Sequence, residues 1–68
     1  MDLSIRGYIK KNFKDSSTKE INEAIGMSVK DGAEEALPGM GVFFEILWEN
    51  SSEDERTQIV SKLKNGLK

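Results

Sequence analysis

The chain has 68 residues, of which 37% are hydrophobic and 32% are charged, and its formal net charge is −2. A chain this short makes one domain near the lower size limit, where net stability is often only about 3–5 kcal/mol unless disulfides, a metal or oligomerisation help. The sequence has no Cys and no His, which excludes disulfides and the usual zinc sites. We therefore expect residues 1–68 to form a single helical domain without a metal or cofactor, and oligomerisation is the support left open.

The charge is unevenly distributed along the chain. Residues 1–19 carry a net charge of +3, residues 20–55 carry −9, and residues 56–68 carry +4. Basic ends around an acidic middle can attract each other within one molecule or between copies, and they make a poor general polyanion binder. The sequence also lacks an apolar run of roughly 18 residues and the apolar core of a signal peptide, so we expect a cytoplasmic protein with no membrane partner.

An amphipathic helix is predicted at the N-terminus, over about Leu3–Phe13. Its apolar residues Ile5, Ile9 and Phe13 recur every four residues along one face. A row of cations runs parallel to that face and could contact phosphates of a nucleic acid, or could simply be a solvated surface that meets the acidic middle of the protein. These candidate anion contacts are Arg6, Lys10, Lys11 and Lys14.

A second helix is predicted to begin at Ser17. Ser17 with Glu20 three residues later forms a capping box, in which each side chain bonds the other residue's free backbone N–H. Gly32 would suit a helix end, but apolar residues stay on one face beyond it. We therefore predict that the helix continues to about Ala36.

The segment Leu37–Asn50, with the sequence LPGMGVFFEILWEN, is the most distinctive part of the chain. Pro38 disfavours helical backbone in the residue before it, and the glycines that follow supply flexible or positive-φ backbone. We predict a turn containing Pro38, Gly39 and Gly41, which sets the approach angle of a third helix that runs from about Gly41 or Val42 to Glu49. The apolar side chains of that helix cover an arc of roughly 240°, far wider than an ordinary surface stripe. They are Val42, Phe43, Phe44, Ile46, Leu47 and Trp48.

A fourth helix is predicted after a second capping box, formed by Ser52 and Glu55. Its apolar positions fall on one face, and its lysines lie toward the C-terminal, negative end of the helix dipole. The whole pattern predicts an all-α fold, a compact bundle of three or four short helices around the hydrophobic third helix. The apolar positions of the fourth helix are Ile59, Val60, Leu63 and Leu67.

The wide apolar arc of the third helix has two explanations. It could be the central helix of a monomer, covered by the other three, or its surplus could pair with a second copy across a two-fold axis. Phe44 and Trp48 lie close together on one edge of the arc and are our interface candidates, with ordinary core burial as the alternative. We expect a homo-oligomer, with a dimer favoured.

Catalysis finds no support in this sequence. Without His or Cys, a nucleophile would need a lysine-activated serine or a pair of carboxylates, and the carboxylates present are explained as solvated faces. Pro-Gly-Met-Gly before a helix resembles an anion site, but it lacks the Lys-Ser/Thr ending and preceding strand of a P-loop, so an interhelical turn is the simpler reading. We predict no enzyme activity and no small-molecule substrate.

The pattern Leu37-Pro38-Gly39-x-Gly41-Val42-x-Phe44-Glu45-x-x-Trp48-x-Asn50 resembles the central signature of the minor small, acid-soluble spore protein I family of endospore-forming Firmicutes. The similarity is strong over residues 34–68 and looser over 1–33. It implies a non-enzymatic protein made in the forespore and resident in the spore core, without a cofactor. The DNA-contact signatures of the major α/β-type acid-soluble spore proteins are absent, so DNA protection does not transfer.

These observations lead to a non-enzymatic structural or packing protein of sporulation that associates with itself through Val42–Trp48. Two rival classes stay open. One is a nucleic-acid-associated protein that uses the basic N-terminal helix, which we consider the weaker reading. The other is an adaptor whose exposed apolar groove holds a helix of another protein.

Overall fold

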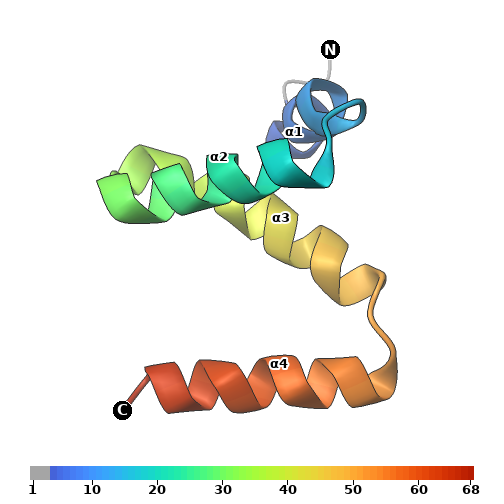
Figure 1. The fold of residues 1–68 in the computed structure, drawn as a ribbon, viewed down its shortest axis with the longest axis vertical. Helices are drawn as coiled ribbons and strands as arrows, with labels where there is room; N and C mark the ends of the chain where they lie inside the picture. The colour runs from blue at the N-terminus through green and yellow to red at the C-terminus, as the bar shows by residue number, and fades with distance from the viewer. Residues whose placement is uncertain (1–3) are drawn as a thin grey trace.

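Five helical segments make up the fold in the part of the chain that the computed structural model describes, residues 4–68 (Figure 1). No β-strand occurs among these residues. The all-α prediction, with short helices arranged around a hydrophobic third helix, is confirmed. The segments are α1 (Ile5–Phe13), α2 (Thr18–Asp31), the short 3-10 helix η1 (Glu34–Ala36), α3 (Leu37–Glu49) and α4 (Glu53–Gly66).

Serine side chains cap three of the helices. The Ser4 hydroxyl accepts a hydrogen bond from the N–H three residues later at the start of α1. The two predicted capping boxes, at Ser17 before α2 and at Ser52 before α4, are both present. Each satisfies N–H groups that the first helical turn leaves without a partner. The predicted start of the first helix at Leu3 lies outside the described residues.

The prediction that the second helix continues to Ala36 is wrong. α2 stops at Asp31, and Gly32 follows in the left-handed conformation with φ 67°, its N–H donating to the Ser28 carbonyl. Glycine adopts this conformation without the steric penalty of a Cβ, which is why it commonly ends helices. Ala36 instead closes η1, so the main change of chain direction before α3 lies at Gly32.

The predicted turn at Pro38, Gly39 and Gly41 is also misplaced, because all three residues are inside α3. Helix α3 begins at Leu37, with Pro38 in its first turn. There the missing proline N–H removes no intrahelical hydrogen bond, since the first N–H groups of a helix have no partner within it. All three residues therefore belong to the N-terminal part of α3.

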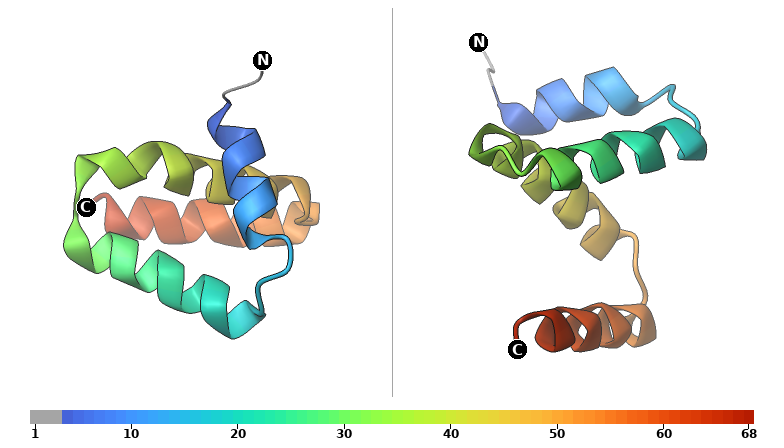
Figure 2. Two further views of the ribbon diagram at one scale, coloured as in Figure 1. Left: turned by 90° about the horizontal axis from the view of Figure 1, so that it is seen from above. Right: turned by 60° about the vertical axis from the view of Figure 1, so that its left-hand side comes forward.

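The helices leave much of the apolar surface uncovered. Helices α2 and α3 run in roughly opposite directions and α1 crosses them, whereas α4 stands apart from this layer beyond the end of α3 (Figure 2). Among the described residues, Ile9 and Val42 are the buried hydrophobic side chains, and no side chain is fully buried. The protein exposes 5980 Å² of surface, whereas a folded monomer of this mass exposes about 4,300 Å². None of the helices in residues 4–68 has the length and apolar character needed to span a membrane.

Candidate functional site

One face of α3 forms the small core with α1. Val42 and Ile9 are only 7% and 8% exposed. A Cβ added at Gly39 would come within 3.3 Å of the Ile9 side chain, so this glycine permits the close approach of α1. The rings of Phe13 and Phe43 meet edge to face, with centroids 5.1 Å apart, a favoured geometry for aromatic pairs.

An ion pair joins the same two helices at the edge of this core. Arg6 donates from Nε to Glu45 Oε1 at 2.5 Å and from its terminal nitrogen to Oε2 at 2.8 Å. Two parallel hydrogen bonds of this kind fix the relative position of arginine and carboxylate. The hydrogen bond from Arg6, followed by the charges of Arg6 and Lys10, holds the pKa of Glu45 below its ordinary value. Part of the basic row of α1 thus meets the acidic middle of the protein.

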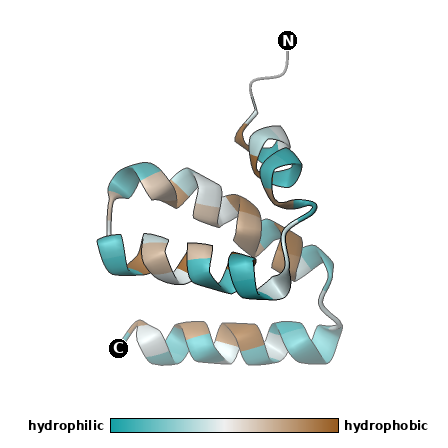
Figure 3. Ribbon diagram, turned by 45° about the horizontal axis from the view of Figure 1, so that its top comes forward, coloured by the Kyte–Doolittle hydropathy of each residue, from teal (hydrophilic) through white to brown (hydrophobic). Residues whose placement is uncertain are grey.

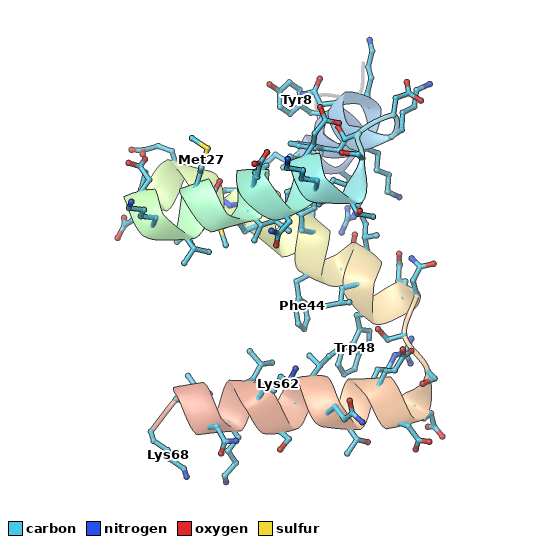
Figure 4. The ribbon with its side chains drawn as sticks, in the orientation of Figure 1. Tyr8, Met27, Phe44, Trp48, Lys62 and Lys68 are labelled. Atoms are coloured by element: carbon cyan, nitrogen blue, oxygen red, sulfur yellow. The ribbon has the colours of Figure 1, made fainter. Side chains whose placement is uncertain are left out.

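The opposite face of α3 is apolar and open. Phe44 is 41% exposed and Leu47 is 50% exposed. Phe44 stacks on Trp48 with ring centroids 5.9 Å apart, and both side chains point from α3 toward α4 (Figure 4). The remaining members of the predicted set, Phe43, Ile46 and Trp48, are half-buried. The six apolar residues of α3 therefore divide between a buried side and an exposed side.

An apolar groove of about 700 Å³ runs along this side of the molecule between α1, α2 and α3. We call it the α1–α3 groove. Lys10 and Lys14 line it together with Glu49, so that its apolar floor has charged residues at its borders. Such a volume lies in the range of ligand pockets and also suits a packed helix. Its principal apolar residues are Ile9, Phe13, Ile21, Ile25, Phe44 and Leu47.

A hydrogen-bonded corner joins α3 to α4. Arg56 Nε donates to the Trp48 carbonyl oxygen at 2.9 Å, and its guanidinium lies 5.1 Å from the Trp48 ring centroid. The Asn50 side-chain amide donates to the Ile46 carbonyl at 2.8 Å, and the Ser51 hydroxyl donates to the Leu47 carbonyl at 2.5 Å. The same three carbonyls also accept from the backbone N–H groups of Asn50 and Ser51, and the side-chain bonds added to these set the angle at which α4 leaves.

The structure separates the four candidate anion contacts. Arg6 is occupied by Glu45, Lys10 and Lys14 border the α1–α3 groove, and Lys11 is exposed. The start of α3 does not favour an anion either, since the two glutamates of η1 precede it. Among residues 4–68 there is also no cluster of three or more acidic groups placed to hold a metal.

Several residues of this surface were not identified from the sequence. Ile21 and Ile25 could be predicted as groove residues only if it were known that α2 lies beside α3. The bond between Arg56 and Trp48 likewise joins residues eight positions apart in different helices, for which helical periodicity has no signal. The apolar character of Ile21 and Ile25 was the available clue, and it showed only that one face of α2 is buried against something.

A family model and individual relatives of the chain point to the same protein family. A sequence model of the family described as small, acid-soluble spore protein I matches residues 3–67. The protein of that name from Bacillus licheniformis is 35% identical over 68 residues, covering 100% of this chain and 97% of its own length. The protein from Bacillus mycoides is also 35% identical over 68 residues, covering 100% of this chain and 99% of its own. No solved structure matches. The chain therefore belongs to the small, acid-soluble spore protein I family.

Proposed function

We propose that this chain is a non-enzymatic packing protein of the spore core that associates with itself through the apolar segment Val42–Trp48 of α3. Membership of the family makes it a spore protein and supports a role in sporulation. Its formation in the forespore and its residence in the core are parts of the proposal, as is the single domain over residues 1–68. The proposal includes neither a catalytic activity nor a small-molecule substrate.

The exposure of Phe44 and Leu47, which line the α1–α3 groove, carries this proposal. Large apolar patches are uncommon on monomeric soluble proteins and often mark an interaction surface. The protein's 5980 Å² of surface exceeds the value for an ordinary monomer of its mass by about 1,700 Å². A standard protein interface removes about 800 Å² from each partner, and obligate dimers remove more. Pairing with a second copy would cover an area of this size.

The test is the solution mass of the purified protein, measured by light scattering over a concentration series. We expect a dimer. Leu47→Glu should shift the protein to monomer, because it puts a charge at the apolar surface while replacing a side chain that is half exposed in one copy. The matched control is Val29→Glu, an exposed apolar residue of α2, which should leave the dimer intact. A monomer at every concentration would contradict self-association.

The rival functions give different results in direct assays. A nucleic-acid-associated protein would bind duplex DNA with an affinity that falls steeply between two salt concentrations, and Lys11→Ala and Lys14→Ala would weaken that binding. Because Arg6 is engaged by Glu45, we expect no binding at low salt. An adaptor for another protein's helix would stay monomeric with its groove exposed, which the light-scattering series also detects.

A further inference from the structure

We propose that the α1–α3 groove is filled by α4 of a second copy, so that each copy provides its own α4 and receives that of its partner. This inference rests on the proposed self-association and specifies the contact that produces it. Four observations lead to it: an uncovered apolar face on α4, a corner that holds α4 away from its own groove, matching charge, and the area that is left exposed.

Helix α4 has an apolar face without enough cover. Val60 and Leu63 are 50% and 49% exposed, and no residue of α4 is fully buried. Hydrophobic residues occur in the middle of α4 as they do along α3 (Figure 3). The residues that line the groove belong to α1, α2 and α3 or, in the case of Lys14 and Asn50, directly follow α1 and α3. The protein therefore has an apolar groove and an amphipathic helix, and the helix does not enter the groove of its own chain.

The corner between α3 and α4 explains why the two stay apart. Arg56 binds the Trp48 carbonyl and covers the Trp48 ring, while Asn50 and Ser51 bind the final turn of α3. Ser52 then starts α4 at once with its capping box. To fold α4 into its own groove, the chain would have to break these bonds across a three-residue linker. A helix from another copy can enter without disturbing them.

The charges of the groove and of α4 match in one orientation. The end of the groove at the C-terminus of α1 has Lys10 and Lys14 on its border, and Glu49 is the one carboxylate of the lining, so the lining carries an excess of positive charge. Toward the connection between α2 and α3 the chain is acidic, with Asp31 followed by the two glutamates of η1. Helix α4 begins with three acidic residues, and its lysines lie toward its C-terminal end. Opposite charges therefore meet at both ends when the incoming α4 runs parallel to α2.

The area left exposed is sufficient for such an exchange. The surplus of about 1,700 Å² per chain exceeds the roughly 800 Å² that each partner loses in a standard interface. An exchanged helix covers two surfaces in each copy, the groove and the face of α4. Because two copies exchange α4 reciprocally, both surfaces are used within one pair and the arrangement closes as a symmetric dimer, whereas the same contact made head to tail would extend into a filament.

Cysteine cross-linking tests this contact, because the natural chain has no cysteine. A chain carrying Ile25→Cys, in the groove, is mixed with a chain of different tag length carrying Leu63→Cys, on α4, and the mixture is oxidised. A disulfide requires Cβ atoms about 3.5–4.5 Å apart. We expect a cross-linked heterodimer, several-fold more abundant than with the control Asn65→Cys, which lies about 200° around α4 from Leu63.

Each outcome has a distinct meaning. A dimer by light scattering that gives no more cross-linking at Leu63→Cys than at Asn65→Cys overturns the exchange and leaves the proposed self-association intact. A protein that is monomeric throughout overturns both. One chain carrying both Ile25→Cys and Leu63→Cys that closes an internal disulfide at high dilution shows that the groove takes its own α4, which also overturns the proposal.

A second pair of variants tests the orientation and does not depend on Ile25. Ile21 lies near the start of α2, so a parallel α4 places Ile59 close to it and Leu67 far from it. We expect Ile21→Cys to cross-link with Ile59→Cys several-fold more than with Leu67→Cys. The reverse preference overturns the orientation derived from charge. Circular dichroism of each reduced variant confirms that the helices are retained before oxidation.

Discussion

Helices α1 and α4 are both joined to α3 through an arginine, and they differ in what accompanies it. Arg6 of α1 binds Glu45 beside the two buried residues, Ile9 of α1 and Val42 of α3. Arg56 of α4 binds the Trp48 carbonyl at a corner, and α4 has no buried residue. Burial of apolar surface is the main source of folding free energy, whereas a hydrogen bond adds less and fixes direction. Helix α1 is therefore held by packing, and α4 is held mainly in orientation.

The largest effect is expected at the contact that is packed. Ile9→Ala should lower the free energy of unfolding by about 2–5 kcal/mol, because a buried side chain is lost and a cavity is left. A domain of this size has little more stability than that, so thermal unfolding followed by circular dichroism should show a largely unfolded protein at room temperature. Leu63→Ala on α4, measured at concentrations where the protein is monomeric, is the control. An equal loss at both sites would contradict the comparison.

At the corner, Arg56→Ala should lower the free energy of unfolding by about 1–2 kcal/mol, through loss of a charged hydrogen bond and a cation–π contact. Trp48 is the single tryptophan of the chain, so its fluorescence reports on this site directly. We expect a changed emission spectrum together with lower stability in urea. Arg56→Lys keeps the charge but lacks the planar guanidinium. Its free energy of unfolding should lie between those of the natural protein and Arg56→Ala. Unchanged fluorescence in Arg56→Ala would mean that the corner does not hold Trp48.

Two glycines of α3 test how closely α1 packs on this helix. Gly41→Ala should raise the free energy of unfolding by about 0.5–1 kcal/mol, since alanine is the better helix former and its Cβ meets no atom within 4 Å. Gly39→Ala should gain less, because its Cβ would come within 3.3 Å of the Ile9 Cδ1 atom. Ile9→Val removes that atom. In the Ile9→Val background, Gly39→Ala should therefore raise the free energy of unfolding by as much as Gly41→Ala does. The measurement is urea unfolding of four variants: Gly41→Ala, Gly39→Ala, Ile9→Val and the double variant Gly39→Ala with Ile9→Val.

The smallest effect is the pH dependence of the ion pair. Because Arg6 lowers the pKa of Glu45, the pair contributes its full stability above the unfolded pKa of about 4.3 and loses it as the pH falls through the lower, folded value. Glu45→Gln should therefore flatten the decline of melting temperature below that pH. Glu49→Gln, on the same helix, is the control and should keep the decline. Glu55, whose pKa is lowered by its hydrogen bonds with Ser52, supplies a separate contribution that remains in both variants.

Local signals in the sequence predicted the four α-helices and the starts of α2 and α4, and failed where two signals competed. The capping boxes at Ser17 and Ser52 depend on residues three apart and were confirmed. At Gly32 the apolar period favoured continuation while the glycine favoured an end, and the backbone conformation decided for the end. At Pro38 the break was expected because proline was placed before the helix, whereas it occupies the first turn.

The candidate surface could be predicted only in part. The wide apolar arc of α3 indicated that the helix must be enclosed, either by the other helices or by a second copy, and the structure divides that arc between Val42 inside and Leu47 outside. Which side of α3 is buried and which is exposed depends on where α1 crosses α3. Periodicity within one helix does not encode that contact. The corner at Arg56 and the groove lining from α2 were missed for the same reason.

The pairing of α1 with α3 also has a consequence for folding kinetics. Arg6 and Glu45 are 39 residues apart in the sequence, while the hydrogen bonds of the caps and the corner join residues at most eight apart. Local contacts form fast, and closing a long loop carries an entropic penalty that must be met before the contact is gained. We expect the individual helices to form first and the docking of α1 to limit the rate. A mutation at Ile9 that weakens the core should then leave helix formation fast.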